Sequence, residues 1–293
     1  MSHLIKYIYG GLTPFYPFIN VIRYFGKYNP TQEINFFLSF DCDYSKDVSH
    51  LDSLLLMLNK YKIKASFACV GYFIEKYPTA HRSILNAGHE ILNHSFTHPR
   101  NQEINPDIDF EDLSLDEQEK EIKATQDLCR TVLDYSPIGF RLPHFGNVKN
   151  INYDSLFKIL KQNQIRYDSS LLHFLRFPDK KNNSLIFRDS KTGIIEFSIT
   201  TCPYHPFTAF DSYHIFRSKR IIYRFGKCRK NLTKTFKKMI KLNRKTMGEI
   251  NIYLDPMDVC NHPEYESIFE QISSDSRIKF STYRDYFSNL INA

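Results

Sequence analysis

The order in which strand-like and helix-like segments follow one another restricts the fold of this chain more than any other feature. From residue 34 onward, short runs rich in β-branched and aromatic residues alternate with longer runs whose apolar residues recur at helical spacing. Strands are predicted near residues 34–40, 65–70, 90–93, 138–141, 165–167 and 249–254. Because strands joined by helical crossovers run in the same direction, this alternation predicts an α/β fold with a largely parallel sheet.

The segments between the strands are predicted helices near residues 51–61, 79–86, 114–133, 152–163, 265–272 and 282–290. The helix at 114–133 begins with Ser114-Leu-Asp-Glu117, a capping-box sequence in which the two end residues satisfy each other's backbone amides. The polar stretch before it, residues 101–113, is predicted to be a surface excursion. The 293 residues, 42% of them hydrophobic, are enough to fill one barrel core. We expect one domain at residues 34–293, preceded by an N-terminal extension at residues 1–33.

The cysteines and the N-terminus bear on the compartment. Six cysteines occur singly, with no Cys-x-x-Cys pair, which favours a reducing environment. Pro14, Pro17, Asn20 and Arg23 interrupt the apolar stretches of the first thirty residues, and no later run approaches the ~18 apolar residues that span a bilayer. We therefore expect a cytoplasmic protein, with a peripheral location at the inner membrane surface as an alternative.

The net charge of +7 is spread unevenly along the chain. No Asp or Glu occurs between Asp211 and Glu249, whereas Lys and Arg are frequent there, and apolar residues at helical spacing predict an amphipathic helix. Such a segment can attract an anionic lipid or a phosphorylated sugar carrier, or it can be an ordinary solvated helix face. Peripheral contact with an anionic membrane is a possible consequence, and nucleic-acid binding is not expected.

Three polar clusters follow predicted strands. They are Asp41-Cys-Asp43, His94-Ser-Phe-Thr-His98 and Arg141-Leu-Pro143-His144. In a parallel α/β barrel, ligands bind at the carboxyl ends of the strands. The clusters therefore predict one shared site.

His94 and His98 are four residues apart, so on a helical turn their imidazoles would share one face. With Asp43 they would form a two-histidine, one-carboxylate set that suits Zn²⁺ or another borderline divalent ion. Asp41 lies two residues before Asp43 on the same strand end, so both side chains point the same way. One carboxylate can bind a metal while the other accepts a proton, and Arg141 can hold a carboxylate ionised. A hydrogen-bonded structural histidine or a helix-capping aspartate is the ordinary alternative.

Several motifs together resemble those of the polysaccharide deacetylases, carbohydrate esterase family four. The first is Ser39-Phe-Asp-Cys-Asp43, the second runs from Gly88 to Pro99 and ends in His94-Ser-Phe-Thr-His98-Pro99, and the third is Gly139-Phe-Arg141-Leu-Pro143. The resemblance implies a distorted (β/α)7 barrel in a single domain. It also implies one divalent metal ion, most naturally Zn²⁺, at Asp43, His94 and His98. Asp41 would then be the general base, Arg141 its orienting partner, and backbone donors near Pro143 and His144 would stabilise the oxyanion.

The fifth motif departs from the family pattern. Where the family carries a histidine that protonates the leaving amine, Ile252-Tyr-Leu-Asp-Pro-Met-Asp258 has Asp255. A carboxyl group with its usual pKa near ~4 is ionised at neutral pH, so Asp255 would need a strongly raised pKa to donate a proton. His144 is the favoured alternative acid, with His205 and His262 as more distant candidates. The change can also mark weakened catalysis.

The function that these observations favour is metal-dependent N-deacetylation of an acetylated amino sugar, free, nucleotide-linked or lipid-linked, in the synthesis of a surface polysaccharide or glycolipid. One alternative is hydrolysis of another amide or ester, such as a formamide, an O-acetyl group or an allantoinase-like substrate. The other is a catalytically weakened homologue that binds sugar.

Overall fold

The computed structural model describes residues 33–145, 151–172, 184–202, 205–217, 231–244 and 248–292. The predicted N-terminal extension, apart from residue 33, lies outside the described residues. The division of the chain at residue 33 therefore stays a prediction.

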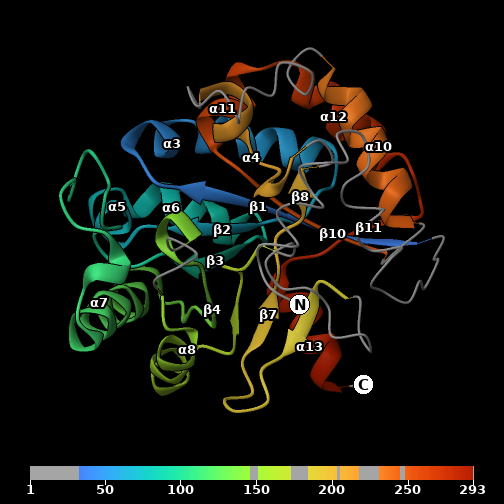
Figure 1. Cartoon of the computed structure of the whole chain (residues 1–293). Helices are drawn as coiled ribbons and strands as arrows, with labels where there is room; N and C mark the ends of the chain where they lie inside the picture. The colour runs from blue at the N-terminus through green and yellow to red at the C-terminus, as the bar shows by residue number, and fades with distance from the viewer. Residues whose placement is uncertain are drawn as a thin grey trace.

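A mainly parallel sheet forms the centre of the molecule (Figure 1). Within the described residues, seven of its parallel strands follow one another in the spatial order β10 (Glu249–Leu254), β1 (Ile34–Cys42), β2 (Ser66–Cys69), β3 (Glu90–Asn93), β4 (Gly139–Phe140), β5 (Tyr167–Asp168) and β7 (Ile195–Phe197). The short strand β6 (Ile186–Arg188) pairs antiparallel with β7, and β11 (Ile278–Phe280) pairs with the start of β1. A separate two-stranded sheet consists of β8 (Thr201–Cys202) and β9 (His205–Ala209).

Helices surround this sheet (Figure 1). They are α3 (Ser45–Ser49), α4 (Leu51–Lys60), α5 (Gly71–Lys76), α6 (Pro78–Asn86), α7 (Leu115–Leu133), α8 (Tyr153–Gln162), α10 (Leu232–Arg244), α11 (Pro256–Asn261), α12 (Glu264–Ser273) and α13 (Tyr283–Asn292). A π-helical segment occupies Tyr213–Arg217, and short 3-10 turns occupy Phe110–Asp112 and Pro143–Phe145. The predicted capping box is confirmed, because Ser114 accepts from the Glu117 amide and the Glu117 carboxylate accepts from the Ser114 amide at 2.8 Å.

The predicted distorted (β/α)7 barrel is confirmed. Within the described residues, β7 and β10 share no ladder, and individual hydrogen bonds join the chain at and after the end of β7 to β10 instead. The Thr200 amide donates to the Asn251 carbonyl at 2.7 Å, and the Asn251 amide donates to Thr200 Oγ1 at 2.9 Å. The barrel is therefore closed by a few polar contacts at this seam rather than by a continuous sheet.

The alternation of side chains along β1 decides what lines the barrel. Phe36, Leu38 and Phe40 belong to the core cluster that packs against the outer helices. The residues between them point inward, beginning with Phe37, which packs on Tyr283 and Phe197. Burial of one such phenylalanine contributes roughly 1.5–3 kcal/mol. The inward set continues with Ser39 and Asp41, so the barrel interior changes from apolar to polar toward the carboxyl end of the strand.

The prediction that residues 101–113 form a surface excursion was wrong in part. Asn101 is fully buried and Phe110 is 1% exposed. The Asn101 side-chain amide donates to the Asp43 carbonyl, while Phe110 packs into the core cluster that contains Phe140. Composition misled here because only two side chains of a polar stretch turn inward.

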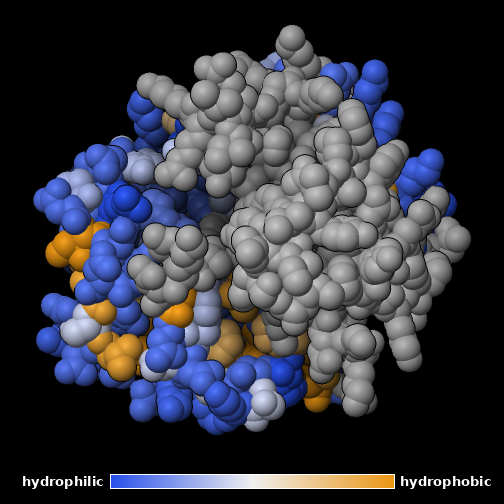
Figure 2. All heavy atoms as spheres, viewed as in Figure 1, coloured by the Kyte–Doolittle hydropathy of each residue, from blue (hydrophilic) through white to orange (hydrophobic). Residues whose placement is uncertain are grey.

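The surface bears on the predicted membrane contact. The described part of the face in Figure 2 is mainly hydrophilic, with hydrophobic side chains in small separate groups. Helix α10 is amphipathic as predicted, with Phe236 and Met239 buried and Lys237 and Lys241 exposed. The rest of the predicted basic segment, residues 218–230 and 245, lies outside the described residues. In the parts of the chain that are described, every helix is too short or too polar to cross a bilayer.

Candidate metal centre and active site

Asp43, His94 and His98 converge at the carboxyl ends of β1 and β3. Asp43 Oδ1 lies 3.2 Å from His94 Nε2 and 3.5 Å from His98 Nε2, and one ligand atom from each residue lies within 4.8 Å of the others. Ligands held about 2.0–2.2 Å from a tetrahedral zinc ion lie about 3.3–3.6 Å from one another. The spacing of these three atoms therefore fits a single divalent ion.

The hydrogen bonds around the histidines leave the same atoms for a metal. His94 Nδ1 donates to the Arg141 carbonyl at 2.7 Å, which directs Nε2 toward Asp43. Asp43 Oδ1 and both ring nitrogens of His98 are buried without a hydrogen-bond partner. Buried polar atoms rarely lack partners, so these orphan atoms fit an ion bound between them. The donor set suits Zn²⁺ or another borderline divalent ion.

The charges of the cluster also suit a metal. Burial alone would raise the pKa of Asp43, but the neighbouring His98 and His94 rings outweigh it and hold that pKa below its usual range. Burial lowers the pKa of His98 to about 3 despite the nearby carboxylate. These shifts favour an ionised Asp43 and a neutral His98, which are the forms that bind metal.

The turn that carries the two histidines differs from its prediction. His94 and His98 do not share a helical turn. They flank an irregular turn, residues 94–98, in which Ser95 has φ of 58° and His98 has φ of 49°. The four-residue spacing brings the rings together, with centroids 4.6 Å apart, because the turn folds back on itself and not because of helical periodicity.

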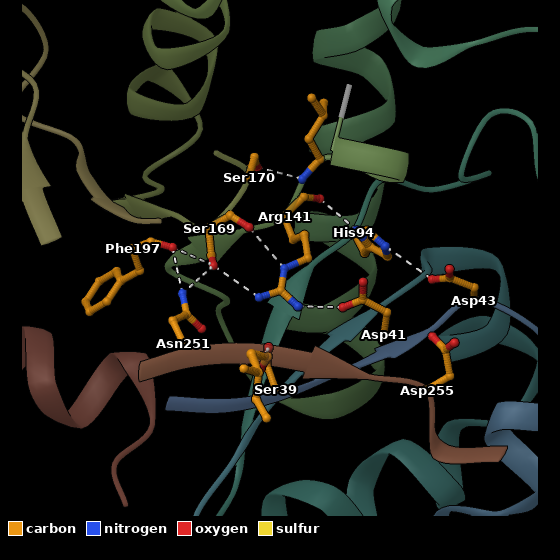
Figure 3. Close-up of polar contacts among 12 residues, drawn as sticks. Ser39, Asp41, Asp43, His94, Arg141, Ser169, Ser170, Phe197, Asn251 and Asp255 are labelled. Atoms are coloured by element: carbon orange, nitrogen blue, oxygen red, sulfur yellow. Dashed lines mark hydrogen bonds and ion pairs between the residues drawn. The ribbon is translucent and has the colours of Figure 1, made fainter. Parts of the chain in front are cut away.

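Asp41 lies beside this cluster and is held by Arg141, as predicted (Figure 3). Arg141 Nη1 donates to Asp41 Oδ1 at 2.6 Å, and both side chains are buried. Burial raises the pKa of Asp41 against the opposing effect of Arg141. The other donors of Arg141 bond the Ser169 carbonyl at 3.1 Å, Ser169 Oγ at 3.1 Å and the Tyr283 hydroxyl at 2.8 Å. The guanidinium is thus fixed in place, and it fixes the carboxylate.

A polar layer that the sequence analysis missed supports Arg141 from below (Figure 3). The Tyr283 hydroxyl donates to Asn251 Oδ1 at 2.6 Å and contacts Ser39 Oγ at 3.2 Å. Asn251 Nδ2 in turn donates to the Phe197 carbonyl at 2.7 Å. The sequence carried a signal for this layer, because polar residues occupy inward positions of otherwise apolar strands. Predicting the strands without the direction of their side chains does not reveal it.

The two candidate acids have different surroundings. The His144 ring packs edge-on against His98, with centroids 4.6 Å apart, and the residue keeps an exposed edge. Its backbone has φ of 53°, and partial desolvation of the ring lowers its pKa. His144 therefore borders the metal centre, and its role as the acid stays a prediction.

Asp255 is 4% exposed and forms an ion pair with Arg217, a residue that the sequence analysis did not single out. Arg217 Nε also donates to Asp258 at 3.0 Å, and Ser212 Oγ donates to Asp255 Oδ2 at 3.2 Å. An arginine partner stabilises the ionised carboxylate, which is the opposite of what an acid at this position requires. One signal for this ion pair was present in the sequence. No Asp or Glu follows Arg217 before Glu249, so a carboxylate partner on that side has to be distant in sequence.

The oxyanion donors expected near Pro143 and His144 stay a prediction. The adjacent Leu142 amide donates to Ser170 Oγ at 2.9 Å. The His262 ring stacks on Phe216 with centroids 3.6 Å apart, and its Nδ1 bonds the Asp258 carbonyl at 2.7 Å. The side chain of His205 lies outside the described part of the structure.

Comparison with known proteins matches this site to one family. A family model described as polysaccharide deacetylase matches residues 28–167, which carry every residue of the metal cluster together with Asp41 and Arg141. The chain is 28% identical over 125 residues to a peptidoglycan-N-acetylglucosamine deacetylase of Bacillus cereus, covering 43% of this chain and 40% of the relative. It is 29% identical over 118 residues to the peptidoglycan-N-acetylmuramic acid deacetylase PdaC of Bacillus subtilis, covering 40% of this chain and 23% of the relative. The chain thus spans less than half the length of these curated relatives.

Comparison of structures supports the same fold over a longer stretch. A solved structure from Mycobacterium smegmatis, assigned to the polysaccharide deacetylases, superimposes with a TM-score of 0.66 at 15% sequence identity. The match covers 91% of this chain and 96% of that chain. At this identity the likeness shows the fold, and it extends beyond the part that the sequence comparisons cover.

Proposed function

Because the chain belongs to the polysaccharide deacetylase family, we propose that it is a metal-dependent hydrolase that removes the acetyl group from the amino group of an acetylated amino sugar. The observation that carries the proposal is the convergence of Asp43, His94 and His98 beside the buried Asp41–Arg141 pair. A site that only stabilised the fold would not need buried metal-binding atoms without partners next to an oriented carboxylate.

The roles of the residues follow from their positions. A divalent ion held by Asp43, His94 and His98, most naturally Zn²⁺, would supply Lewis acidity for amide hydrolysis. Asp41, fixed by Arg141, accepts the proton of the attacking water. Because Arg141 makes three further hydrogen bonds, the carboxylate does not need to reorganise as it takes the proton.

The leaving amine needs a proton before it can depart. His144 borders the cluster through its contact with His98 and keeps an exposed edge, so it is placed to donate one. Asp255 is held as a carboxylate by Arg217, and we assign it a structural role beside the site.

The nature of the substrate is supported by the relatives and by charge. Both curated relatives are named for N-acetylated amino sugars of peptidoglycan. The exposed Lys237 and Lys241 on α10 favour a phosphorylated, nucleotide-linked or lipid-linked sugar and peripheral contact with an anionic membrane. A role in making a surface polysaccharide or glycolipid, from the cytoplasmic side, is the corresponding physiological proposal.

The decisive experiment combines metal analysis of the purified protein with an acetate-release assay. We expect one divalent ion per chain and acetate release from N-acetylated oligosaccharides or sugar conjugates, lost after chelation and restored by added Zn²⁺. A formate and O-acetyl screen run in parallel tests the alternative amide and ester substrates. If a fully metal-loaded protein released no acyl group from any of these, hydrolase activity would have to be abandoned.

A second candidate is favoured by the Arg217–Asp255 ion pair, which occupies the position of the family's acid. In that case the chain is a weakened homologue that binds sugar. His144→Ala and Asp255→Ala, each assayed on an amide and on an ester with a good leaving group, separate the two. If His144 is the acid, its loss lowers amide turnover by roughly 10²–10⁴-fold and spares the ester. Unchanged amide turnover in His144→Ala would remove it from that role.

The membrane proposal has its own test. Liposomes containing anionic lipid should retain the wild type better than a variant with Lys237, Lys238 and Lys241 changed to Gln. The matched control changes Lys120, Lys158 and Lys161 to Gln, which removes the same charge from α7 and α8. Equal retention of the two variants and the wild type would mean that α10 does not direct membrane contact.

A further inference from the structure

A carboxylate from α7 holds the turn that carries both metal-binding histidines. Glu121 Oε2 accepts hydrogen bonds from the Phe96 amide at 2.9 Å and the Thr97 amide at 2.7 Å. Its Oε1 accepts from the Thr97 hydroxyl at 3.0 Å. These three contacts reach residues that lie between His94 and His98.

The opposite side of the same turn rests on the start of α5. The Gly71 amide donates to the Ser95 carbonyl and the Tyr72 amide to the Phe96 carbonyl, both at 2.9 Å. A Cβ at Gly71 would stand 2.6 Å from the Phe96 ring, so only glycine allows this approach. The Phe96 and Thr97 amides are therefore satisfied by Glu121, and the Ser95 and Phe96 carbonyls by α5. Local side chains satisfy the other two amides, because Asn93 Oδ1 accepts from Ser95 and Ser95 Oγ accepts from His98.

The turn needs such support because its backbone is unfavourable. Ser95 and His98 both have left-handed φ values, a conformation that costs on the order of 1–3 kcal/mol for a residue other than glycine. His98 also makes no side-chain hydrogen bond that would hold its ring. Contacts from Glu121 and α5 therefore add to the local hydrogen bonds that hold this backbone in place.

From this geometry we propose that Glu121 is a positioning residue that sets the metal affinity of the site, by holding the turn in the shape that brings His94 and His98 to one ion. The inference rests on the metal site of the proposed function. It does not require any particular substrate.

The alternative is that Glu121 only stabilises the packing of α7. That alternative predicts a loss of stability without a specific change in metal binding. It also predicts that Glu121→Gln and Glu121→Ala differ little in metal affinity, because both remove the same surface charge from a half-buried position.

The test measures Zn²⁺ affinity by competition with a chromophoric chelator. Glu121→Ala should bind Zn²⁺ about 10–100-fold more weakly, the range found when a group that orients a ligand is removed. Glu121→Gln should recover most of the affinity, because its amide oxygen can still accept from the Phe96 and Thr97 amides. The control is Asp127→Ala on the same helix, whose exposed carboxylate contacts only Lys123 and Arg130 among the described residues.

Amide hydrogen exchange of the metal-free proteins gives a second readout, in which Phe96 and Thr97 should exchange faster in Glu121→Ala than in Asp127→Ala. Equal Zn²⁺ affinities of these two variants would overturn the proposal. Should Glu121→Ala fail to fold, Thr97→Ala decides: it removes one of the three contacts and should weaken Zn²⁺ binding relative to Asp127→Ala, and equal affinities again overturn the proposal. A wild type that binds Zn²⁺ but releases no acetate would end the proposed function and leave this inference standing.

Discussion

Two aspartates on neighbouring strand ends, the partly buried Asp43 and the buried Asp255, face the same region of the barrel but have opposite surroundings (Figure 3). Asp43 is flanked by two histidines, and one of its oxygens has no hydrogen-bond partner. Asp255 is bound by Arg217 and Ser212. A buried carboxylate must be neutralised in one way or another. The first is left for an external cation, whereas the second is already neutralised by the protein, and this difference separates a ligand from a structural group.

The largest effect is expected when Asp43 is removed from between the two histidines. Asp43→Ala should lose more than the roughly 100-fold in metal affinity that removal of an orienting group can cost, because it removes a ligand itself. Acetate release should fall with it. Asp255→Ala should keep its metal content, as measured by elemental analysis of both variants. Equal metal loss in the two would mean that the comparison is wrong.

Asp41→Asn tests the carboxylate that neither binds metal nor pairs with Arg217. The turnover of this variant is expected to drop by about 10²–10⁴-fold, because asparagine keeps the shape of the side chain but cannot accept the proton. Metal content should stay nearly unchanged. The measurement is acetate release at matched metal occupancy, and a variant that keeps most of its activity would show that Asp41 is not the base. Arg141→Ala should also be damaging, because Asp41 then loses its orienting partner.

The second environment is tested through stability. Arg217→Ala should lower the free energy of unfolding by on the order of 3 kcal/mol, because it leaves Asp255 and Asp258 buried without their cation. Arg217 is 29% exposed at its side chain, so solvent screening places the loss toward the low end. The free energy of unfolding in urea is then compared for Arg217→Gln, Asp255→Asn and the double variant. The double variant should lose less of this free energy than the sum of the losses in the two single variants. Additive losses would contradict a direct ion pair.

The smallest effect concerns a third way to neutralise a buried aspartate. Asp168 and Glu196 lie opposite each other on β5 and β7, and burial raises the pKa of both carboxyls. Since the folded pKa values lie above the unfolded ones, this stabilisation is complete below the unfolded pKa, about 4, and is lost as pH rises through the folded values.

Glu196→Gln should flatten that dependence, because its amide can donate to Asp168 at any pH. Urea unfolding at pH 5 and pH 8 measures the change in the free energy of unfolding. A carboxyl whose folded and unfolded pKa values differ by one contributes about 1.4 kcal/mol to that change. Glu75→Gln, which changes an exposed carboxylate on α5, serves as the control. An unchanged pH dependence in Glu196→Gln would show that the pair does not share a proton.

Much of the site could be predicted because it depends on local sequence. The alternation of strand and helix indicated the parallel sheet, and the positions of Asp41, Asp43, His94 and Arg141 at strand ends placed them at one edge of it. These features follow from backbone geometry within one or two elements. The capping box at Ser114 was predictable for the same reason.

The partners of the buried charges could not be predicted in this way. Whether Asp255 meets a proton, a histidine or Arg217 depends on where the π-helical segment at Tyr213–Arg217 packs, thirty-eight residues away in sequence. The histidine turn likewise contacts Glu121 and α5, which are distant in sequence. Charge and hydrogen-bond partners are set by contacts across the fold, and buried groups are sensitive to them because water no longer screens or satisfies them. The sequence by itself therefore determined which groups meet at the barrel mouth, and only the tertiary structure decided which of them are left available for a ligand.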